Sequence, residues 1–263
     1  MLTAGIDAGA EYLKVVLLSD SNIVSHSILA YEHEPILTIA NKGLSQATEK
    51  AGVTEQEIDF IAATGGNREA VSFSHEQVTE PRCCTRGATW LFPSTKTVID
   101  LGAEKCLVMK CRNGIPLKFA RSDKCASGTG RYLQVICKLL GIEVDDMGPL
   151  SLKSQKNVDI QSTCTIFAES EAISLIHQNY APEDIMWGAI RALAARIRSL
   201  IVGVGLETDV TMIGGIAKNI GVIKALEQQT SCNILVAEEP MIGAALGAAI
   251  VAAESKRSAN TAQ

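Results

Sequence analysis

The stretch Gly5-Ile6-Asp7-Ala8-Gly9 has a counterpart 93 residues later, Val98-Ile99-Asp100-Leu101-Gly102. In each stretch an aspartate ends an apolar run, and a glycine stands two positions after it. The apolar runs predict a strand before each aspartate, and two further strand patterns follow each glycine. The chain is therefore predicted to contain a duplicated strand–turn–strand–strand unit.

The remaining pattern adds helices after each unit, which is typical of an α/β fold. Strands are expected at 2–7, 13–18, 23–29, 58–63, 97–102, 105–110, 116–120, 210–213 and 233–236. Helices are expected at 35–51, 83–91, 127–140, 166–178, 182–204, 219–228 and 242–254, with a frayed tail at 255–263. The predicted domains are residues 1–94 plus about 242–256, and residues 95–241.

Composition narrows the classes of protein. The chain has 263 residues, 47% of them hydrophobic and 20% charged, which indicates a globular protein. A net charge of −5, without a basic stripe, argues against nucleic-acid binding. The start shows no secretory pattern, and the apolar run at 241–253 is too short to span a bilayer. We expect a cytoplasmic protein.

The two aspartate–glycine turns are candidates for a nucleotide site. Glycine lets backbone N–H groups approach phosphates closely, and a carboxylate can hold Mg²⁺. A single such turn is equally compatible with a structural role. Together with Gly214-Gly215 after a third strand, the two turns favour a phosphate site. Neither the P-loop motif nor the dinucleotide-binding motif occurs.

Eight cysteines in a chain without an export pattern are expected to be reduced. Cys125 and Cys164 each precede a predicted helix, where the helix dipole stabilises a thiolate, and both have polar neighbours. Two cysteine ligands per chain are half of the four that an iron–sulfur cluster needs. A second subunit related by a two-fold axis would supply the other two. Two buried thiols without ligand function are the alternative. The other six cysteines are expected to be packed or surface thiols.

Over nearly its whole length the chain resembles the BadF/BadG/BcrA/BcrD family of ATPases. This family contains activators of 2-hydroxyacyl-CoA dehydratases and the ATP-hydrolysing subunits of benzoyl-CoA reductase. The resemblance implies the actin/Hsp70/sugar-kinase (ribonuclease H-like) fold, with two duplicated domains and a nucleotide cleft between them. The motifs that carry it are the two aspartate–glycine turns, Lys124-Cys125-Ala126-Ser127-Gly128-Thr129-Gly130-Arg131, Ser162-Thr163-Cys164-Thr165-Ile166-Phe167-Ala168-Glu169-Ser170-Glu171 and Gly214-Gly215-Ile216-Ala217-Lys218-Asn219.

The resemblance also implies site residues and cofactors. MgATP would bind in the cleft, with Asp7 and Asp100 as the catalytic carboxylates. Cys125 and Cys164 would bind one [4Fe–4S] cluster shared between two subunits, which are identical in the activators and paralogous in benzoyl-CoA reductase. The nucleotide-binding residues implied are Gly5, Asp7, Gly9, Ala10, Lys14, Asp100, Gly102, Ala103, Gly214, Gly215 and Asn219.

ATP hydrolysis would drive low-potential electrons from ferredoxin or flavodoxin to an iron–sulfur reductase or dehydratase under anaerobic conditions. Ala10 stands where a serine or threonine is usual, and Lys105 stands where the activators typically have an aspartate. Ala103 and the loop after Cys125 look more like the smaller benzoyl-CoA reductase ATPase subunit. That subunit is the preferred prediction, and a homodimeric dehydratase activator is the alternative. The acyl-CoA substrate is not specified by this chain.

Two readings of other classes remain open. A small-molecule kinase of the same fold would contain no iron, although the short chain leaves little room for a substrate subdomain. A scaffold subunit would keep the fold without turnover, and Ala10 and Lys105 favour this reading. Iron content separates electron transfer from the kinase, and ATP turnover separates it from the scaffold.

Overall fold

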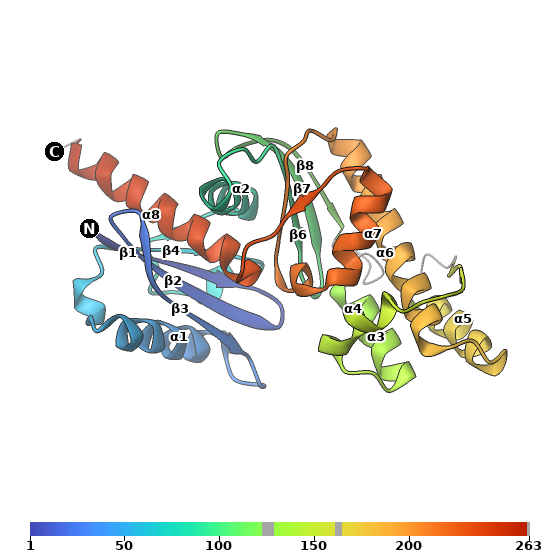
Figure 1. Ribbon diagram of the computed structural model, residues 1–263. Helices are drawn as coiled ribbons and strands as arrows, with labels where there is room; N and C mark the ends of the chain where they lie inside the picture. The colour runs from blue at the N-terminus through green and yellow to red at the C-terminus, as the bar shows by residue number, and fades with distance from the viewer. Residues whose placement is uncertain (123–128, 161–164, 262–263) are drawn as a thin grey trace.

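The computed structural model describes residues 1–122, 129–160 and 165–261. Cys125 and Cys164 therefore lie outside the described residues. The described chain forms two five-stranded sheets with helices packed on both faces of each (Figure 1). An α/β architecture was the prediction from sequence, and it is confirmed.

The two sheets have the same strand order and the same strand directions. The first has the order β3-β2-β1-β4-β5 and the second the order β8-β7-β6-β9-β10. In each, the central strand pairs antiparallel with the next strand in sequence and parallel with the strand after a crossover. The strands are β1 (Leu2–Ala8), β2 (Tyr12–Ser19), β3 (Asn22–Ala30), β4 (Phe60–Thr64), β5 (Glu76–Gln77), β6 (Thr97–Leu101), β7 (Cys106–Arg112), β8 (Ile115–Ser122), β9 (Val210–Ile213) and β10 (Ile234–Leu235). The predicted duplication is present in the topology.

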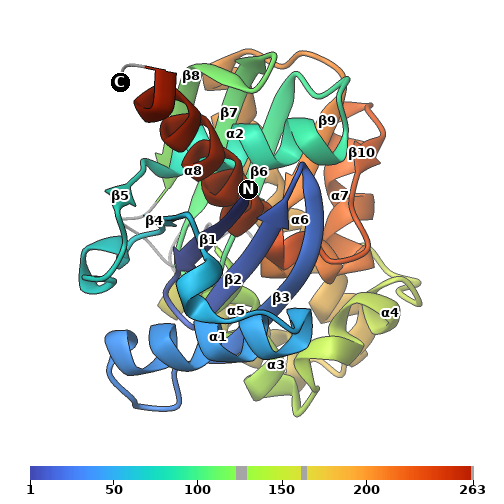
Figure 2. The same ribbon diagram turned by 90° about the vertical axis from the view of Figure 1, so that its left-hand side faces the viewer.

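Helices cover both faces of each sheet. The α-helices are α1 (Ile36–Ala51), α2 (Glu80–Leu91), α3 (Gly130–Leu140), α4 (Met147–Ser151), α5 (Thr165–His177), α6 (Pro182–Val204), α7 (Ile220–Thr230) and α8 (Gly243–Thr261). The first sheet lies between α1 and α8, and the second has α2 on one face and α6 on the other (Figures 1 and 2). Among the described residues, no helix combines the length and apolarity needed to cross a membrane.

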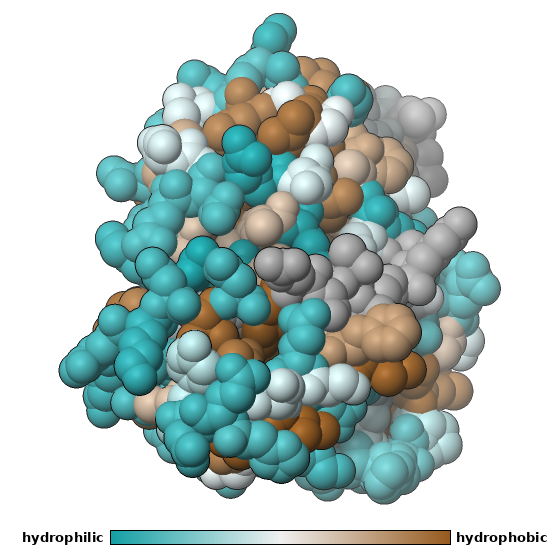
Figure 3. Space-filling model, turned by 90° about the vertical axis from the view of Figure 1, so that its right-hand side faces the viewer, coloured by the Kyte–Doolittle hydropathy of each residue, from teal (hydrophilic) through white to brown (hydrophobic). Residues whose placement is uncertain are grey.

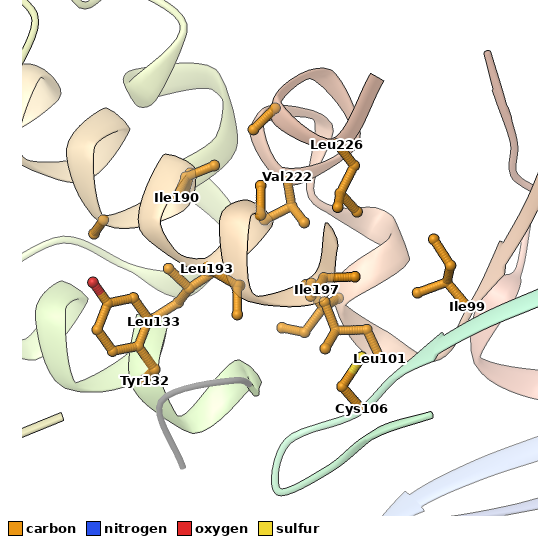
Figure 4. Close-up of a cluster of buried hydrophobic side chains, with 14 of the residues drawn as sticks. Ile99, Leu101, Cys106, Tyr132, Leu133, Ile190, Leu193, Ile197, Val222 and Leu226 are labelled. Atoms are coloured by element: carbon orange, nitrogen blue, oxygen red, sulfur yellow. The ribbon is translucent and has the colours of Figure 1, made fainter. Parts of the chain in front are cut away.

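The largest core lies between α6 and the second sheet. Ile190, Leu193 and Ile197 of α6 are buried, and Figure 4 shows them among side chains of α3, α7 and the sheet. Leu133 and Ile136 of α3 belong to the same core, as the i, i+3 spacing predicts. Burial of apolar side chains supplies most of the stabilisation of such a layer.

Several segments differ from the prediction, and strand β5 and the short helix α4 were not predicted. The tail from residue 255 was expected to be frayed, which is wrong, because α8 continues to Thr261. Ser255 donates a hydrogen bond to Glu76, and Glu254 pairs with Arg86, so α8 is anchored beyond its apolar part. The helix predicted at 83–91 begins at Glu80, whose side chain pairs with two cations described below.

Helices α2 and α8 cross at very short distance between the two sheets. A Cβ on Gly87 would lie 1.9 Å from the Gly243 carbonyl oxygen, and a Cβ on Gly247 would lie 1.8 Å from that of Cys83. Gly5 plays the same part where α8 lies on β1, because its Cβ would lie 2.0 Å from the Ala245 oxygen. Glycine at these positions allows backbone to touch backbone.

The assignment of residues 1–94 plus 242–256 to one domain and 95–241 to the other remains a prediction. Its support is that α8 packs on β1, β2 and β4 of the first sheet. Helix α2 also contacts strands of the second sheet, so it joins the two halves.

We expect Gly5→Ala to lower the free energy of unfolding by about 3 kcal/mol, because α8 must move away from β1. The matched control is Gly203→Ala in α6, where the added Cβ meets nothing within 4 Å. That variant should gain up to about 1 kcal/mol from helix propensity. Denaturant unfolding measures both, and equal stabilities for the two variants would contradict the packing role of Gly5.

Candidate functional site

A cleft of about 870 Å³ lies between the carboxyl ends of the two central strands. Both aspartate–glycine turns border it. Nine of the predicted nucleotide-binding residues line it, namely Asp7, Gly9, Ala10, Lys14, Asp100, Gly102, Ala103, Gly214 and Gly215. The structure therefore brings together residues that are as much as 208 positions apart in the sequence.

Two predicted residues are not among those that line the cleft. Gly5 lies under α8 and serves the packing described above. Asn219 caps α7, since its side chain accepts a hydrogen bond from the Val222 N–H at 3.0 Å. Their geometry gives each a structural role, and a nucleotide contact remains only a prediction for both.

The two turns are built alike. The Gly9 N–H donates to the Tyr12 oxygen at 3.2 Å, and the Gly102 N–H donates to the Lys105 oxygen at 2.9 Å. These hydrogen bonds close each turn directly after its aspartate. In the first turn, the Gly9 oxygen also accepts from Asn67 Nδ2 at 2.7 Å. Each aspartate is thus held beside a short, defined loop.

The glycine that directly follows the neighbouring parallel strand lies against each aspartate. A Cβ on Gly65 would lie 2.6 Å from Asp7 Oδ1, and a Cβ on Gly214 would lie 2.7 Å from Asp100 Oδ1. Both glycines have positive φ, +94° and +92°, a conformation that favours glycine. Glycine therefore lets the backbone lie against each carboxylate, where a side chain would collide with it.

The two aspartates differ in their partners. Asp7 faces Lys14 across the β1–β2 pair, and Lys14 Nζ lies 3.0 Å from Asp7 Oδ2. Asp100 faces Leu107 at the equivalent place, and its described hydrogen bond comes from the Cys84 thiol at 3.6 Å. Burial, reinforced by the charge of Asp7, raises the pKa of Asp100 to about 7.

Lys105 is balanced by an acidic residue that the sequence pattern did not indicate. Its ammonium pairs with Glu80, the first residue of α2, which is only 4% exposed. Arg121 of β8 pairs with the other oxygen of Glu80. Burial lowers the pKa of Lys105 to about 8, while the nearby Asp7 opposes this shift. Lys105 thus remains compatible with the site, and its charge is partly compensated.

Sequence reasoning missed several side chains of the cleft. Asn67 and Arg68 follow Gly65-Gly66 and line the first half, and Arg68 donates to the Gly65 oxygen at 3.2 Å. The available signal was the Gly-Gly pair after a strand, which matches Gly214-Gly215 in the second unit. No pattern indicated Glu80 or Arg121.

The six cysteines within the described residues pack as expected. Cys232 is half-buried, and the other five are buried. Burial raises the pKa of all five buried thiols, those of Cys83, Cys84, Cys106, Cys111 and Cys137. Over the described ranges, no group of three or more histidines, cysteines or acids is arranged to hold a metal ion. The prediction for Cys125 and Cys164 concerns residues outside those ranges.

The arrangement can bind a polyphosphate with a divalent cation. The turns supply backbone N–H groups, and Lys14, Arg68 and Lys218 supply positive charge along the cleft. Two carboxylates supply the hard oxygen ligands that Mg²⁺ prefers. A family model described as the BadF/BadG/BcrA/BcrD ATPase family matches residues 4–252. The chain belongs to this ATPase family.

Two relatives match this family member over almost the entire length of both chains. The (R)-2-hydroxyglutaryl-CoA dehydratase activating ATPase of Acidaminococcus fermentans is 37% identical, covering 95% of this chain and 96% of its own. The 2-hydroxyisocaproyl-CoA dehydratase activator of Clostridioides difficile is 36% identical, covering 96% and 95%.

Solved structures of such proteins superimpose closely. The A. fermentans dehydratase component A has a TM-score of 0.95 at 36% identity, covering 98% of this chain and 99% of its own. The C. difficile activator with bound ADPNP has a TM-score of 0.93 at 35% identity, covering 100% and 98%. A ROK hexokinase from Thermus thermophilus, at 12% identity and a TM-score of 0.56, shares the fold alone. The predicted actin-like fold is confirmed.

The preference for the benzoyl-CoA reductase subunit has weaker support than its alternative. A benzoyl-CoA reductase subunit of Thauera aromatica is 28% identical, covering 86% of this chain and 82% of its own. The dehydratase activators are more similar over more of the chain. The preference relied on Ala103 and the loop after Cys125, a few positions that overall similarity outweighs.

We expect Asp100→Asn to stabilise the nucleotide-free, Mg²⁺-free protein in a pH-dependent way. Between the ordinary carboxyl pKa near 4 and about 7, the folded state retains a proton that the unfolded state has lost. The stability linked to protonated Asp100 is therefore lost as the pH rises to about 7. The free energy of unfolding of the variant should exceed that of the native protein by a few kcal/mol at pH 8 and by less at pH 5. Thermal unfolding at both pH values measures this, and a pH-independent difference would refute the shifted pKa.

Proposed function

We propose that this chain is the ATP-hydrolysing activator of a 2-hydroxyacyl-CoA dehydratase and delivers low-potential electrons to it. The observation that carries the proposal is the pair of aspartate–glycine turns facing one cleft in a chain 36–37% identical to dehydratase activators. An ATPase subunit of benzoyl-CoA reductase is the second candidate, supported by the more distant T. aromatica relative.

The residues of the cleft fit MgATP. Backbone N–H groups of both turns would bind phosphate oxygens, and Asp7 and Asp100 would hold the cation. When bound, Mg²⁺ neutralises phosphate charge. Lys14 keeps the Asp7 carboxylate in place through its 3.0 Å ion pair. The structure of the C. difficile activator contains bound ADPNP, which supports nucleotide binding by this chain.

Hydrolysis needs a water molecule aligned with the terminal phosphate. Asp100 would orient this water, because it lines the cleft at the end of the second central strand. As the water attacks phosphorus, the bond to the β-phosphate oxygen breaks, and the water proton passes to solvent or to Asp100.

The electron-transfer part of the proposal rests on Cys125 and Cys164, which we assign as ligands of one [4Fe–4S] cluster shared by two subunits. The buried thiols elsewhere support the assignment indirectly, since burial keeps them protonated. A cluster with two ligands from each chain requires a dimer, here a homodimer as the alternative reading predicts.

Exposed apolar side chains support a partner surface near α5. Ile166 and Phe167, which belong to the second cysteine motif, are 69% and 65% exposed. The end of the molecule that carries α5 shows apolar patches among hydrophilic residues (Figure 3). A protein partner that covers these apolar side chains would remove their surface from water, which favours association. Ferredoxin or flavodoxin as electron donor, and an anaerobic cytoplasm, complete the proposal.

The first test is ATP hydrolysis by the anaerobically purified protein with Mg²⁺. We expect Asp7→Asn to lower kcat by about 100-fold or more, because the cation loses a charged ligand. The control is Asp159→Asn, an exposed aspartate paired with Arg191 outside the cleft. A native protein that binds but does not hydrolyse ATP would favour the scaffold reading instead.

A second test measures iron and acid-labile sulfide. We expect about four irons per dimer, and a loss of most of them in Cys125→Ser and in Cys164→Ser, while Cys232→Ser retains them. Reconstitution with a 2-hydroxyacyl-CoA dehydratase or with benzoyl-CoA reductase components then distinguishes the two candidates. An iron-free native protein, isolated alone and with its partner, would remove the electron-transfer proposal.

A further inference from the structure

Arg131, the second residue of α3, bridges the two nucleotide turns. Its Nη1 lies 3.1 Å from Glu11 Oε1, and its Nη2 lies 3.0 Å from Glu104 Oε1. Glu11 belongs to the loop after Asp7, and Glu104 to the loop after Asp100. Each glutamate stands four positions after its aspartate, so the two occupy equivalent places in the duplicated units. One guanidinium therefore joins symmetry-related positions of the two halves.

Backbone hydrogen bonds fix this arginine to the second turn. The Gly130 N–H donates to the Gly102 oxygen at 2.9 Å, and the Arg131 N–H donates to the Ala103 oxygen at 2.7 Å. The described contacts to the first turn are made by side chains, since Gln134 of α3 adds a 3.1 Å hydrogen bond to Glu11. The Arg131 guanidinium is thus carried by one half and reaches across to the other.

We propose that Arg131 is a positioning residue that holds the two nucleotide turns in register across the cleft. Without it, Glu11 and Glu104 would be like charges near the same point, and their repulsion would separate the turns. With it, a planar fork satisfies one carboxylate on each side, a geometry that lysine cannot reproduce. The inference rests on the proposed function, since the turns are positioned for a nucleotide.

The bridge acts by preorganisation. The Arg131 side chain is 45% exposed and that of Glu104 is 57% exposed, so these ion pairs contribute little to global stability. They do reduce the freedom of the turns before a ligand arrives, which lowers the entropy lost on binding. Loss of the bridge should therefore weaken nucleotide binding while the fold persists.

The experiment compares Arg131→Gln with Arg191→Gln in the anaerobically purified full-length protein. Arg191 is a matched control, because this residue of α6 forms a 3.0 Å ion pair with Asp159, away from the cleft lining. Arg131→Gln should weaken ADP binding about tenfold, raise the KM for ATP by a similar factor and change kcat less. Arg131→Lys should recover part of the affinity, and Arg191→Gln should match the native protein.

Hydrogen exchange provides a readout that needs no nucleotide. In the free protein, Arg131→Gln should speed amide exchange in peptides covering both turns roughly two- to fivefold. In a double-mutant cycle, Glu104→Gln should change amide exchange in the turns less in the Arg131→Gln background than in the native background. Unchanged amide exchange and unchanged ADP affinity in Arg131→Gln would refute the positioning role of Arg131.

The two hypotheses fail in different ways. If the native protein neither binds ADP nor hydrolyses ATP, the proposed function fails, whereas exchange in the nucleotide-free turns still tests the bridge. If the native protein is an active ATPase and Arg131→Gln behaves like Arg191→Gln in all assays, the bridge alone is refuted.

Discussion

The structure depends on holding two carboxylates of like charge at one cleft. Asp7 and Asp100 end the central strands of two equivalent sheets, and the charge of Asp7 contributes to the raised pKa of Asp100. Such a pair is unfavourable in a protein without compensation. Lys14 compensates Asp7 directly, while the hydrogen bond described for Asp100 comes from a thiol. A divalent cation would relieve this repulsion, so the repulsion itself favours binding of the cation.

The contact between the two halves of the chain places both aspartates at this cleft. The strands can face a common cleft because α2 and α8 cross with backbone in contact, at Gly87 and Gly247. Gly5, which belongs to the first aspartate–glycine motif, lets α8 lie directly on β1. A motif residue that suggested phosphate binding is thus placed for packing. The glycines that lie against the carboxylates are Gly65 and Gly214, which directly follow the neighbouring parallel strands β4 and β9.

Charged side chains around the cleft form two groups of ion pairs. Glu80 at the start of α2 pairs with Lys105 and Arg121, and Arg131 joins the loops that follow the two aspartates. Lys105, which on sequence grounds weakened the case for turnover, has its charge partly compensated by the buried Glu80, which also pairs with Arg121. Side chains of β8, α2 and α3 therefore surround the cleft together with those of the two turns.

Local signals in the sequence were enough to predict every strand except β5 and to predict the duplicated turns, because apolar runs and aspartate–glycine turns need no distant partner. The other predicted residues that line the cleft, such as Ala10, Lys14 and Ala103, came from the family resemblance. The family resemblance added the actin-like fold. Glu80, Arg68 and the bridge at Arg131 could not be predicted, since their partners are distant in sequence and carry no local pattern. The end of α8 was misjudged, because its polar segment is helical where Ser255 and Glu254 bind residues of other elements. These points were settled by the tertiary structure, since ion pairing and close backbone packing depend on which segments the two sheets bring together.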